Sequence, residues 1–290
     1  DSPLYQWLAV KSISTLLLNW KSPAGVLAHD ALFPSFSNYF GFWAWDSWKQ
    51  AVALSLFAPH LAEQQIRAMF DLQNSPGYDQ PPYDGMIPDV FYPFPSDAPN
   101  WYNTKPPLAG WAIWHTYLAN KNADFLRELY PKLVQYHLFW YKYRDHNNDS
   151  LAEYGCSNDD VQFAKYESGM DNAARFDDLV LLGNGNSTWS SDRASVDLNS
   201  YLYAEKLFLS SMAKELGMGG DAARWQSEAE ALARMIQDHF FDAERGYFFD
   251  RYLNGTLQSE PGCEGFIPLW SGAAAPEQAA AAVKLLTDPK

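Results

Sequence analysis

The chain of 290 residues is 47% hydrophobic and 19% charged, a composition that supports a large buried core and excludes a disordered chain. Its formal net charge of −14, from 35 acidic and 21 basic residues, disfavours nucleic acid and anionic lipid as partners. No apolar stretch reaches the ~20 residues needed to cross a bilayer. The sequence therefore predicts a soluble protein, periplasmic or cytoplasmic if it is bacterial.

Eight segments have apolar residues at the spacing of a helix that packs on a core. They span 3–20, 45–58, 60–74, 106–120, 122–143, 195–217, 219–240 and 276–287. Pro59 is suited to open a helix and Asn122 to cap one, while Gly217 separates the last long pair. No segment has a sustained strand pattern. The sequence therefore predicts an all-α chain, with helices paired as antiparallel hairpins.

Three long loops separate these helices, at 75–105, 144–194 and 241–272, and they are rich in Pro, Gly, Asn, Asp and aromatic residues. Loops of this length in a compact domain are uncommon and usually functional. The chain also contains 12 Trp, 17 Tyr and 18 Phe. Aromatic rings beside carboxylates suit a sugar, whose C–H faces stack while its hydroxyls form hydrogen bonds. We expect one domain over residues 1–290, a barrel of helix pairs with its function on the loops.

The segment FGFWAWDSWKQ places Trp43, Trp45 and Trp48 around Asp46 at the start of a predicted helix. The carboxylate of Asp46 is suited to cap the free N–H groups of that helix. Capping does not account for the three tryptophans, which favour a sugar-binding subsite. The residues alone leave both interpretations open.

Two further segments, GMIPDVFY and WYNTKPPLAGW, bring Asp89, Asn103 and Lys105 into loops that precede a helix. Loop residues of these types are commonly solvated surface groups. The neighbouring Trp101 and Trp111 add support for a place in a binding pocket, and the residues alone leave both interpretations open.

An oxygen-rich loop, RDHNNDSLAEYG, has Asp145, Asn147, Asp149 and Glu153 at alternate positions, with the carbonyl of Leu151 between them. Loops of the EF-hand type bind calcium in this manner, with ligands at positions 1, 3, 5, 7 and 9. The glycine at position 6 and the glutamate at position 12 are replaced by other residues. The loop predicts a structural calcium site, with an Asx-rich turn as the alternative.

Two more segments supply candidate acids. YESGMDNAARFD holds Glu167, Asp171, Arg175 and Asp177, and GCEGF holds Glu264 between glycines. Acids at a helix N-terminus are favoured by the helix dipole, which is one explanation of the first segment. The other is a carboxyl group that donates a proton to a leaving oxygen, with its pKa raised by an aromatic pocket. Glu264 either projects into a cleft or belongs to a surface turn.

Taken in this order, WAWDSWKQA, GMIPDV, NTKPPLAGW, YPKLVQYHLFW, RDHNNDSLAEYG, ESGMDNAARFD and EGFIPLWSGAA resemble the helical catalytic domain of glycoside hydrolase family 63, and are most similar to its bacterial α-glucosidases. The resemblance implies an (α/α)6 toroid of helix hairpins and hydrolysis with inversion by two carboxyl groups. Asp171 falls on the aspartate of the family's ESGxD motif and is implied to be the general acid. Asp46 is implied to line the subsite of the cleaved sugar, with Trp45 stacking nearby.

The resemblance also implies further site residues. Asp89, Lys105 and Glu264 match segments that line the pocket in relatives, and with Trp48 they complete the expected substrate-binding set. The oxygen-rich loop matches one that binds calcium in some members, although Ala194 stands where those members have another glutamate ligand. No cofactor is expected for catalysis itself.

The second half of the implied mechanism lies elsewhere. The family's catalytic base is a glutamate that would follow the segment TDPK at the end of this sequence. The resemblance therefore implies the N-terminal two-thirds of a toroid, with the remaining part of the barrel as a partner. The expected substrate is an oligosaccharide or a small α-glycoside.

Two other functions are compatible with the sequence. A sugar epimerase or isomerase on the same fold would need an acid–base pair, commonly two histidines, whereas the six histidines here are scattered and none lies in the ESGMD segment. A carbohydrate-binding protein without turnover would account for the aromatic clusters alone. Cys156 and Cys263 leave both their pairing and the redox compartment open.

Overall fold

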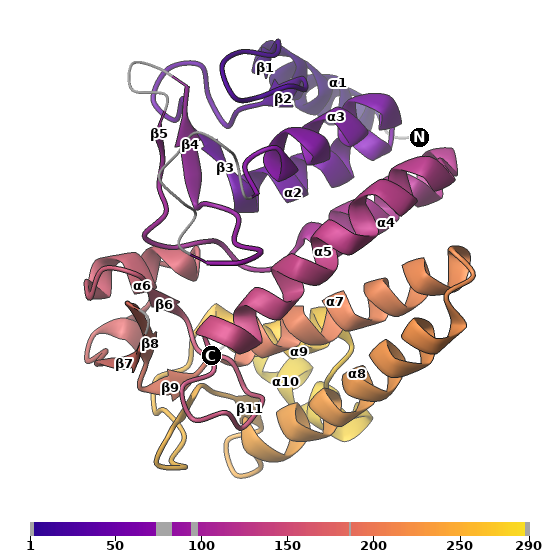
Figure 1. Cartoon of the computed structure of the whole chain (residues 1–290). Coiled ribbons are helices and arrows are strands. Elements are labelled where there is room, and N and C mark those ends of the chain that lie inside the picture. Colours follow the sequence, from indigo (N-terminus) through magenta and orange to yellow (C-terminus); the bar gives the residue numbers. More distant parts are fainter. Residues whose placement is uncertain (1–2, 74–82, 94–97, 186, 288–290) are drawn as a thin grey trace.

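The computed structural model describes residues 3–73, 83–93, 98–185 and 187–287, and helices dominate it (Figure 1). The helices are α1 (Pro3–Leu18), α2 (Ala44–Ser55), α3 (Pro59–Phe70), α4 (Ala109–Asn120), α5 (Ala123–Tyr143), α6 (Val161–Glu167), α7 (Val196–Glu215), α8 (Gly219–His239), α9 (Ile267–Ser271) and α10 (Pro276–Thr287). Eight of them correspond to the predicted segments, which confirms the helical class. α6 and α9 escape prediction because they are too short to show a helical period.

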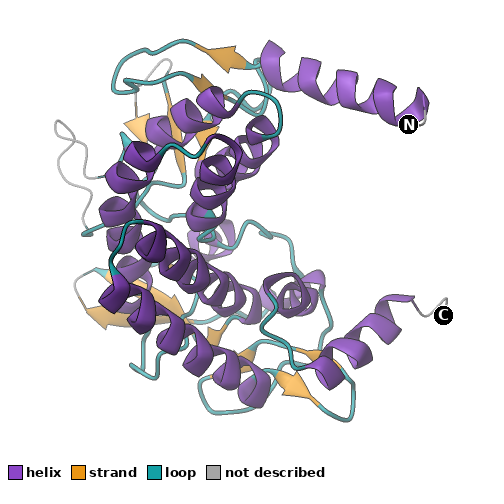
Figure 2. Ribbon diagram, turned by 90° about the vertical axis from the view of Figure 1, so that its right-hand side faces the viewer, coloured by secondary structure: helices purple, strands orange, loops and turns teal. Residues whose placement is uncertain are grey.

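Consecutive helices pack as hairpins, α2 with α3, α4 with α5, and α7 with α8. The first helix of each pair also contacts the first helix of the following pair, so that α2 touches α4 and α4 touches α7. Helix α7 in turn touches α9. These contacts make one continuous row of helices with their hairpin partners packed beside it. Figure 2 shows the result as an arc, with α1 and α10 at its two ends.

Local sequence signals set where two helices begin. Pro59 is the first residue of α3, a position where its missing N–H leaves no hydrogen bond unmade. Asn122 caps α5, because its side-chain oxygen accepts the N–H groups of Asp124 and Phe125, each at 3.2 Å. Both predicted signals are confirmed.

The start of α2 differs from the prediction. The helix begins at Ala44 with Trp43 as the N-cap residue, and no side chain caps it. Trp43 is held in an extended conformation because it pairs with Val90 in a short sheet. Asp46 therefore lies inside the first turn, and the interpretation of Asp46 as the cap is wrong.

Short strands fold the long loops back onto the helices. One antiparallel sheet joins β3 (Phe42–Trp43), β4 (Val90–Tyr92) and β5 (Ala98–Pro99), and another joins β6 (Gly155–Cys156), β8 (Thr188–Ser191) and β7 (Leu181–Gly185). Two-stranded ladders join β1 (Trp20–Lys21) to β2 (Ala31–Leu32), β9 (Arg193–Ala194) to β12 (Arg251–Tyr252), and β10 (Phe241–Asp242) to β11 (Tyr247–Phe248). Strands of two to five residues are too short to show the alternation that predicts a strand.

The two cysteines do not pair. The thiol of Cys156 is buried, that of Cys263 is exposed, and both are free. Within the part of the chain that the structure describes, every helix is too short or too polar to cross a membrane.

A fully buried acid–base pair lies in the helical core. His137 of α5 and Glu205 of α7 place Nδ1 and Oε2 2.8 Å apart, and Gly110 of α4 donates its N–H to Glu205. Burial raises the pKa of Glu205 to about 8 and lowers the pKa of His137 well below its ordinary value. The pair is therefore most stable at neutral pH with a proton on Glu205.

The substitution Glu205→Gln should remove a pH dependence of stability. Because the pKa of Glu205 is higher in the folded chain than in the unfolded chain, its contribution is complete at low pH and is lost as the pH rises toward about 8. Protonation of His137 in the unfolded chain affects the wild type and the variant alike, so it cancels in their comparison. From pH 6.5 to pH 8 the free energy of unfolding should fall by about 2 kcal/mol more in the wild type than in the variant. Urea unfolding at both pH values measures this, and equal slopes would contradict it.

Candidate active site

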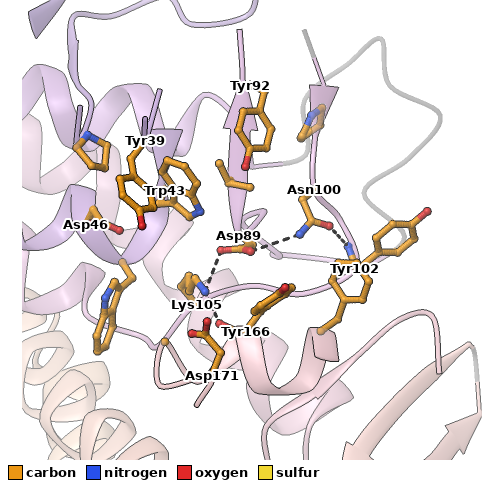
Figure 3. A pocket seen from close by; sticks show the side chains of 16 residues that line it. Tyr39, Trp43, Asp46, Asp89, Tyr92, Asn100, Tyr102, Lys105, Tyr166 and Asp171 are labelled. Carbon is orange, nitrogen blue, oxygen red and sulfur yellow. Dashed lines mark hydrogen bonds and ion pairs between the residues drawn. The ribbon is translucent and has the colours of Figure 1, made fainter. Parts of the chain in front are cut away.

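A cavity of about 900 Å³ opens beside the start of α2 (Figure 3). Its described walls consist of Pro34, Tyr39, Trp43, Trp45, Asp46, Asp89, Val90, Tyr92, Pro99, Asn100, Tyr102, Lys105, Phe163, Tyr166, Gly169 and Asp171. Five of the residues predicted for the site thus meet here: Trp45, Asp46, Asp89, Lys105 and Asp171. They come from four separate segments, the first turn of α2, the residue before β4, the loop before α4 and the turn after α6.

Asp89 and Lys105 form a buried ion pair in the cavity wall. Lys105 Nζ lies 3.2 Å from Asp89 Oδ1 and also donates to the carbonyl oxygen of Tyr166. The amide of Asn100 donates to Asp89 Oδ2 at 3.4 Å, and Asn103, behind the wall, accepts the Asp89 N–H through its carbonyl at 2.9 Å. Burial raises the pKa of Asp89 to about 6, against the opposing effect of the lysine charge.

The first turn of α2 carries a second acid next to a lysine. Burial raises the pKa of Asp46, and the charges of Lys49 and Lys105 oppose that shift. Lys49 Nζ lies 3.1 Å from the ring centroid of Trp45, a cation–π contact, and burial lowers the pKa of Lys49 to about 8. Lys49 is not among the predicted site residues, although its spacing of three residues from Asp46 puts both on one side of the helix.

Asp171 is half-buried in the turn that follows α6, and its carboxyl group points toward Lys105 in Figure 3. The turn is shaped by Ser168, whose hydroxyl accepts the N–H of Met170 at 3.0 Å, and by Gly169, whose φ is +70°. A Cβ atom on Gly169 would lie 3.1 Å from a ring carbon of Trp45. The glycine therefore allows the turn to lie directly against the indole.

Glu167 anchors the same segment from the other side. Its fully buried carboxylate accepts hydrogen bonds from Arg144 Nε at 2.8 Å and Arg144 Nη2 at 2.9 Å. It also accepts the N–H groups of Thr104 at 3.1 Å and Gly155 at 2.6 Å. The glutamate of the ESGMD segment is thus a structural residue that fixes the loop before α4 and the turn of Asp171.

A second buried ion cluster follows Asp171 in the chain. Both terminal nitrogens of Arg175 bind Asp197, at 2.9 and 2.8 Å, and Nη1 also lies 3.2 Å from Asp250. The hydroxyl of Tyr154 donates to Asp197 at 3.2 Å. Burial raises the pKa of Asp250 to about 7. Neither Asp197 nor Asp250 belongs to a sequence motif that predicts its role. The fold alone brings both of them to Arg175.

Two predicted substrate-binding residues do not line this cavity. Trp48 is fully buried and packs on Phe70 with ring centroids 5.7 Å apart, because it falls on the core face of α2 with Ala44 and Ala51. Its assignment to the sugar site is therefore corrected to a core position.

Glu264 lies elsewhere, in the short helix η2 (Cys263–Phe266), and is 4% exposed. Burial raises its pKa, and the charge of Arg175 opposes the shift. Its Oε2 atom has no hydrogen-bond partner among the described residues. Glu264 thus belongs to the surroundings of the Arg175 cluster and not to the cavity wall.

The oxygen-rich loop lies apart from the cavity. The carboxylate of Asp145 accepts the N–H groups of Asp149 at 3.0 Å and Ser150 at 2.9 Å, and Asp149 accepts that of Leu151 at 2.9 Å. Ser150 has φ +72°, the left-handed conformation that glycine supplies at this position of EF-hand loops. In residues 3–73, 83–93, 98–185 and 187–287, no three His, Cys, Asp or Glu side chains are grouped as metal ligands.

Solved structures share this fold at low sequence identity. The family 63 mannosylglycerate hydrolase from Thermus thermophilus, in complex with Tris, is similar with a TM-score of 0.69 and 19% identity, over 94% of this chain and 75% of that chain. Neutral trehalase Nth1 from Saccharomyces cerevisiae is similar with a TM-score of 0.67 and 17% identity, over 88% of this chain and 54% of that chain. Both have the (α/α)6 toroid fold of helical glycoside hydrolases, which confirms the predicted fold class.

The family model described as "Mannosylglycerate hydrolase MGH1-like glycoside hydrolase domain" matches residues 39–290. The chain belongs to this family of glycoside hydrolases, within family 63, as its motifs implied. It is 23% identical to the mannosylglycerate hydrolases MGH1 and MGH2 of Selaginella moellendorffii over 84% of its length. The chain spans 60% of the length of these two relatives.

The substitution Gly169→Ala should distort the turn that carries Asp171 in addition to lowering stability. Gly217 is a matched control, because its φ of +75° is similar but a Cβ atom there would meet nothing within 4 Å. Each alanine variant should lose about 1 kcal/mol of unfolding free energy from the left-handed backbone. Only Gly169→Ala should also reduce any glycoside hydrolysis by the complete protein, since its new methyl group pushes on Trp45. Thermal unfolding and initial rates measure both effects, and equal rates for the two variants would contradict the role of this contact.

Proposed function

We propose that the protein is a glycoside hydrolase that cleaves α-glucosidic or related α-glycosidic bonds with inversion, with Asp171 as the general acid. The observation that carries the proposal is the meeting of Asp171 with Asp46 and Asp89 in one aromatic cavity of about 900 Å³. Family membership supports the reaction class, and the cavity has room for an oligosaccharide end or a small α-glycoside.

Aromatic and acidic side chains have complementary roles in this proposal. Rings such as Trp43, Tyr92 and Tyr102 offer apolar faces to the C–H surface of a sugar, while Asp46 and Asp89 accept hydrogen bonds from its hydroxyl groups. One face of Trp45 is covered by the ammonium of Lys49, so its remaining surface is the part available to the sugar. Glu264 lies outside this proposed set because it does not line the cavity.

The proposed chemistry divides one displacement between two carboxyl groups. Protonated Asp171 donates its proton to the glycosidic oxygen as the bond from that oxygen to the anomeric carbon breaks. A water molecule attacks the anomeric carbon from the opposite face and loses its proton to a base, which requires a carboxyl separation of roughly 6.5–9.5 Å. We place this base in the part of the family's length that residues 1–290 do not span, as the motif resemblance implies.

The substitution Asp171→Asn should abolish turnover and leave substrate binding nearly unchanged. In the complete protein, loss of a general acid should lower kcat by about 100-fold or more, while KM changes little. Asp177→Asn is the matched control, because Asp177 is exposed on the same segment and does not line the cavity. Initial rates on an α-glucoside measure the effect. Proton NMR of the first-released anomer tests inversion, and release of the α-anomer from an α-glycoside would refute that part of the proposal.

One of the two alternative functions fits the cavity less well. Its described lining residues include no histidine, which disfavours an epimerase with an imidazole acid–base pair. Binding without turnover remains a defined outcome of the same assay. It would appear as tight sugar binding with equal, negligible rates in the wild type and the Asp171→Asn variant.

We also propose that loop 145–153 holds a structural calcium ion through Asp145, Asn147, Asp149, Glu153 and the Leu151 carbonyl. The residues fit a cation in two respects. Glu153 is fully buried with Oε1 unpartnered among the described residues, and its pKa is raised by burial, with the charges of Asp145 and Asp149 adding to the shift. A bound calcium would neutralise these like charges and hold the loop.

Calcium should therefore raise thermal stability, and Glu153→Gln should weaken the effect. At a free concentration about 100-fold above Kd, a site specific to the folded chain adds about 2.7 kcal/mol to the free energy of unfolding. Differential scanning fluorimetry in calcium, in magnesium and in chelator measures the shift. Equal melting temperatures in all three conditions would leave the Asx-rich turn as the correct interpretation.

A further inference from the structure

The indole ring of Trp45, which lines the cavity, is covered on one face by a lysine. Lys49 follows Trp45 by four residues, one turn further along α2, and its Nζ atom lies 3.1 Å from the centroid of the Trp45 ring. An ammonium group over an aromatic face is attracted by the negative charge of the π system. This face of the indole is therefore not open to a sugar.

The other face of Trp45 is covered by the turn that carries Asp171. A Cβ atom on Gly169 would lie 3.1, 3.2 and 3.3 Å from the Cε2, Cζ2 and Cδ2 atoms of Trp45. Distances so nearly equal to three adjacent ring carbons place this Cβ over the face of the indole and not beyond its edge. Lys49 Nζ is not among the three atoms nearest to it, so the ammonium lies over the opposite face.

A third element also contacts the indole. Tyr201 of α7 is buried, and its ring meets that of Trp45 at an interplanar angle of 79°, with centroids 6.5 Å apart. Trp45 is thus held by its own helix, by the turn at Gly169 and by α7. Because both faces are covered, mainly the edge of the indole is left to a ligand in the cavity.

Resting on the proposed function, we infer that Lys49 and Trp45 are positioning residues for Asp171. Lys49 holds the indole from one side, and the indole supports the turn at Gly169, two residues before the proposed general acid. Proton donation requires the carboxyl group within hydrogen-bond reach of the glycosidic oxygen, so a small displacement of the turn lowers the rate of the chemical step. In this role Trp45 holds the acid in place, where the motif resemblance implies stacking on the sugar.

The substitution Lys49→Met tests the inference, because it removes the ammonium and keeps an apolar side chain of similar length. In the complete protein, kcat for an α-glucoside should fall on the order of tenfold while KM changes by less than about twofold. Lys49→Arg restores a cation over the ring of Trp45 and should keep kcat within about twofold of the wild type. An unchanged kcat in Lys49→Met, or an equal loss in both variants, would overturn the inference.

Lys121 supplies a matched control. It is exposed at the end of α4, its Nζ atom lies 5.1 Å from the ring centroid of Tyr117, and it does not line the cavity. Lys121→Met therefore also removes one positive charge and one cation–π contact, and it should leave kcat and KM as in the wild type. A loss equal to that of Lys49→Met would assign the effect to net charge and overturn the inference.

A double-mutant cycle tests whether Lys49 and Gly169 act through the same ring. Because both press on Trp45, the combined effect of Lys49→Met and Gly169→Ala on kcat should differ from the product of the single effects by about threefold or more. Lys121→Met combined with Gly169→Ala should match the product of its single effects within about twofold. Independent effects in both cycles would overturn the inference.

Hydrogen exchange separates this test from the test of hydrolysis. The N–H of Gly169 donates to the Tyr166 carbonyl at 3.1 Å and that of Met170 to Ser168 Oγ at 3.0 Å, so exchange at these amides reports opening of the turn. Lys49→Met should speed their exchange by about threefold or more, and the control variant should not. If no glycoside is cleaved, the proposed function fails, but exchange still decides. Wild-type exchange in Lys49→Met would overturn the positioning role.

Discussion

The ion pair between Arg144 and Glu167 is the constraint on which the cavity depends. Four hydrogen bonds converge on the buried carboxylate of Glu167, two from Arg144 at the end of α5 and two from the backbone of Thr104 and Gly155. A buried charge that loses its partner costs about 3–5 kcal/mol, so these segments hold their relative positions. Because Asp171 follows Glu167 by four residues, this ion pair also fixes the position of the segment that carries the proposed acid.

The turn of Asp171 is also held at its far end. Arg175 binds Asp197 at the start of α7 and reaches Asp250 beyond β11, so that three distant segments converge at Arg175. Each cluster is fully buried and is held by charge-assisted hydrogen bonds between arginine and carboxylate. Between these two fixed points only the turn itself, with Gly169 against Trp45, approaches the ligand space. The architecture thus separates the residues that hold Asp171 from those that line the cavity.

Much of the fold could be predicted from the sequence because helical periodicity and caps are local signals, as the cap at Asn122 illustrates. The prediction that the cavity residues share one site depended on the motif resemblance, because local chemistry did not distinguish Asp171 from other acids. Trp48 was misassigned because aromatic clustering does not reveal which helix face is buried. Lys49 and Asp250 were missed for another reason. Their roles arise from a side-chain rotamer over Trp45 and from contacts across distant segments, which a sequence does not display.

The exposed aromatic side chains of the cavity are separate from the buried residues that hold Asp171 in place. Tyr39 and Tyr102 are 64% and 52% exposed, and neither side chain contributes to the ion clusters that hold Asp171. Substitutions at such positions alter the cavity surface at little cost to folding, because exposed side chains contribute little buried area. A lineage can therefore change what the cavity accepts one rim residue at a time, while Asp171 keeps its position. Diversity of ligands within one helical scaffold is the expected evolutionary outcome of that separation.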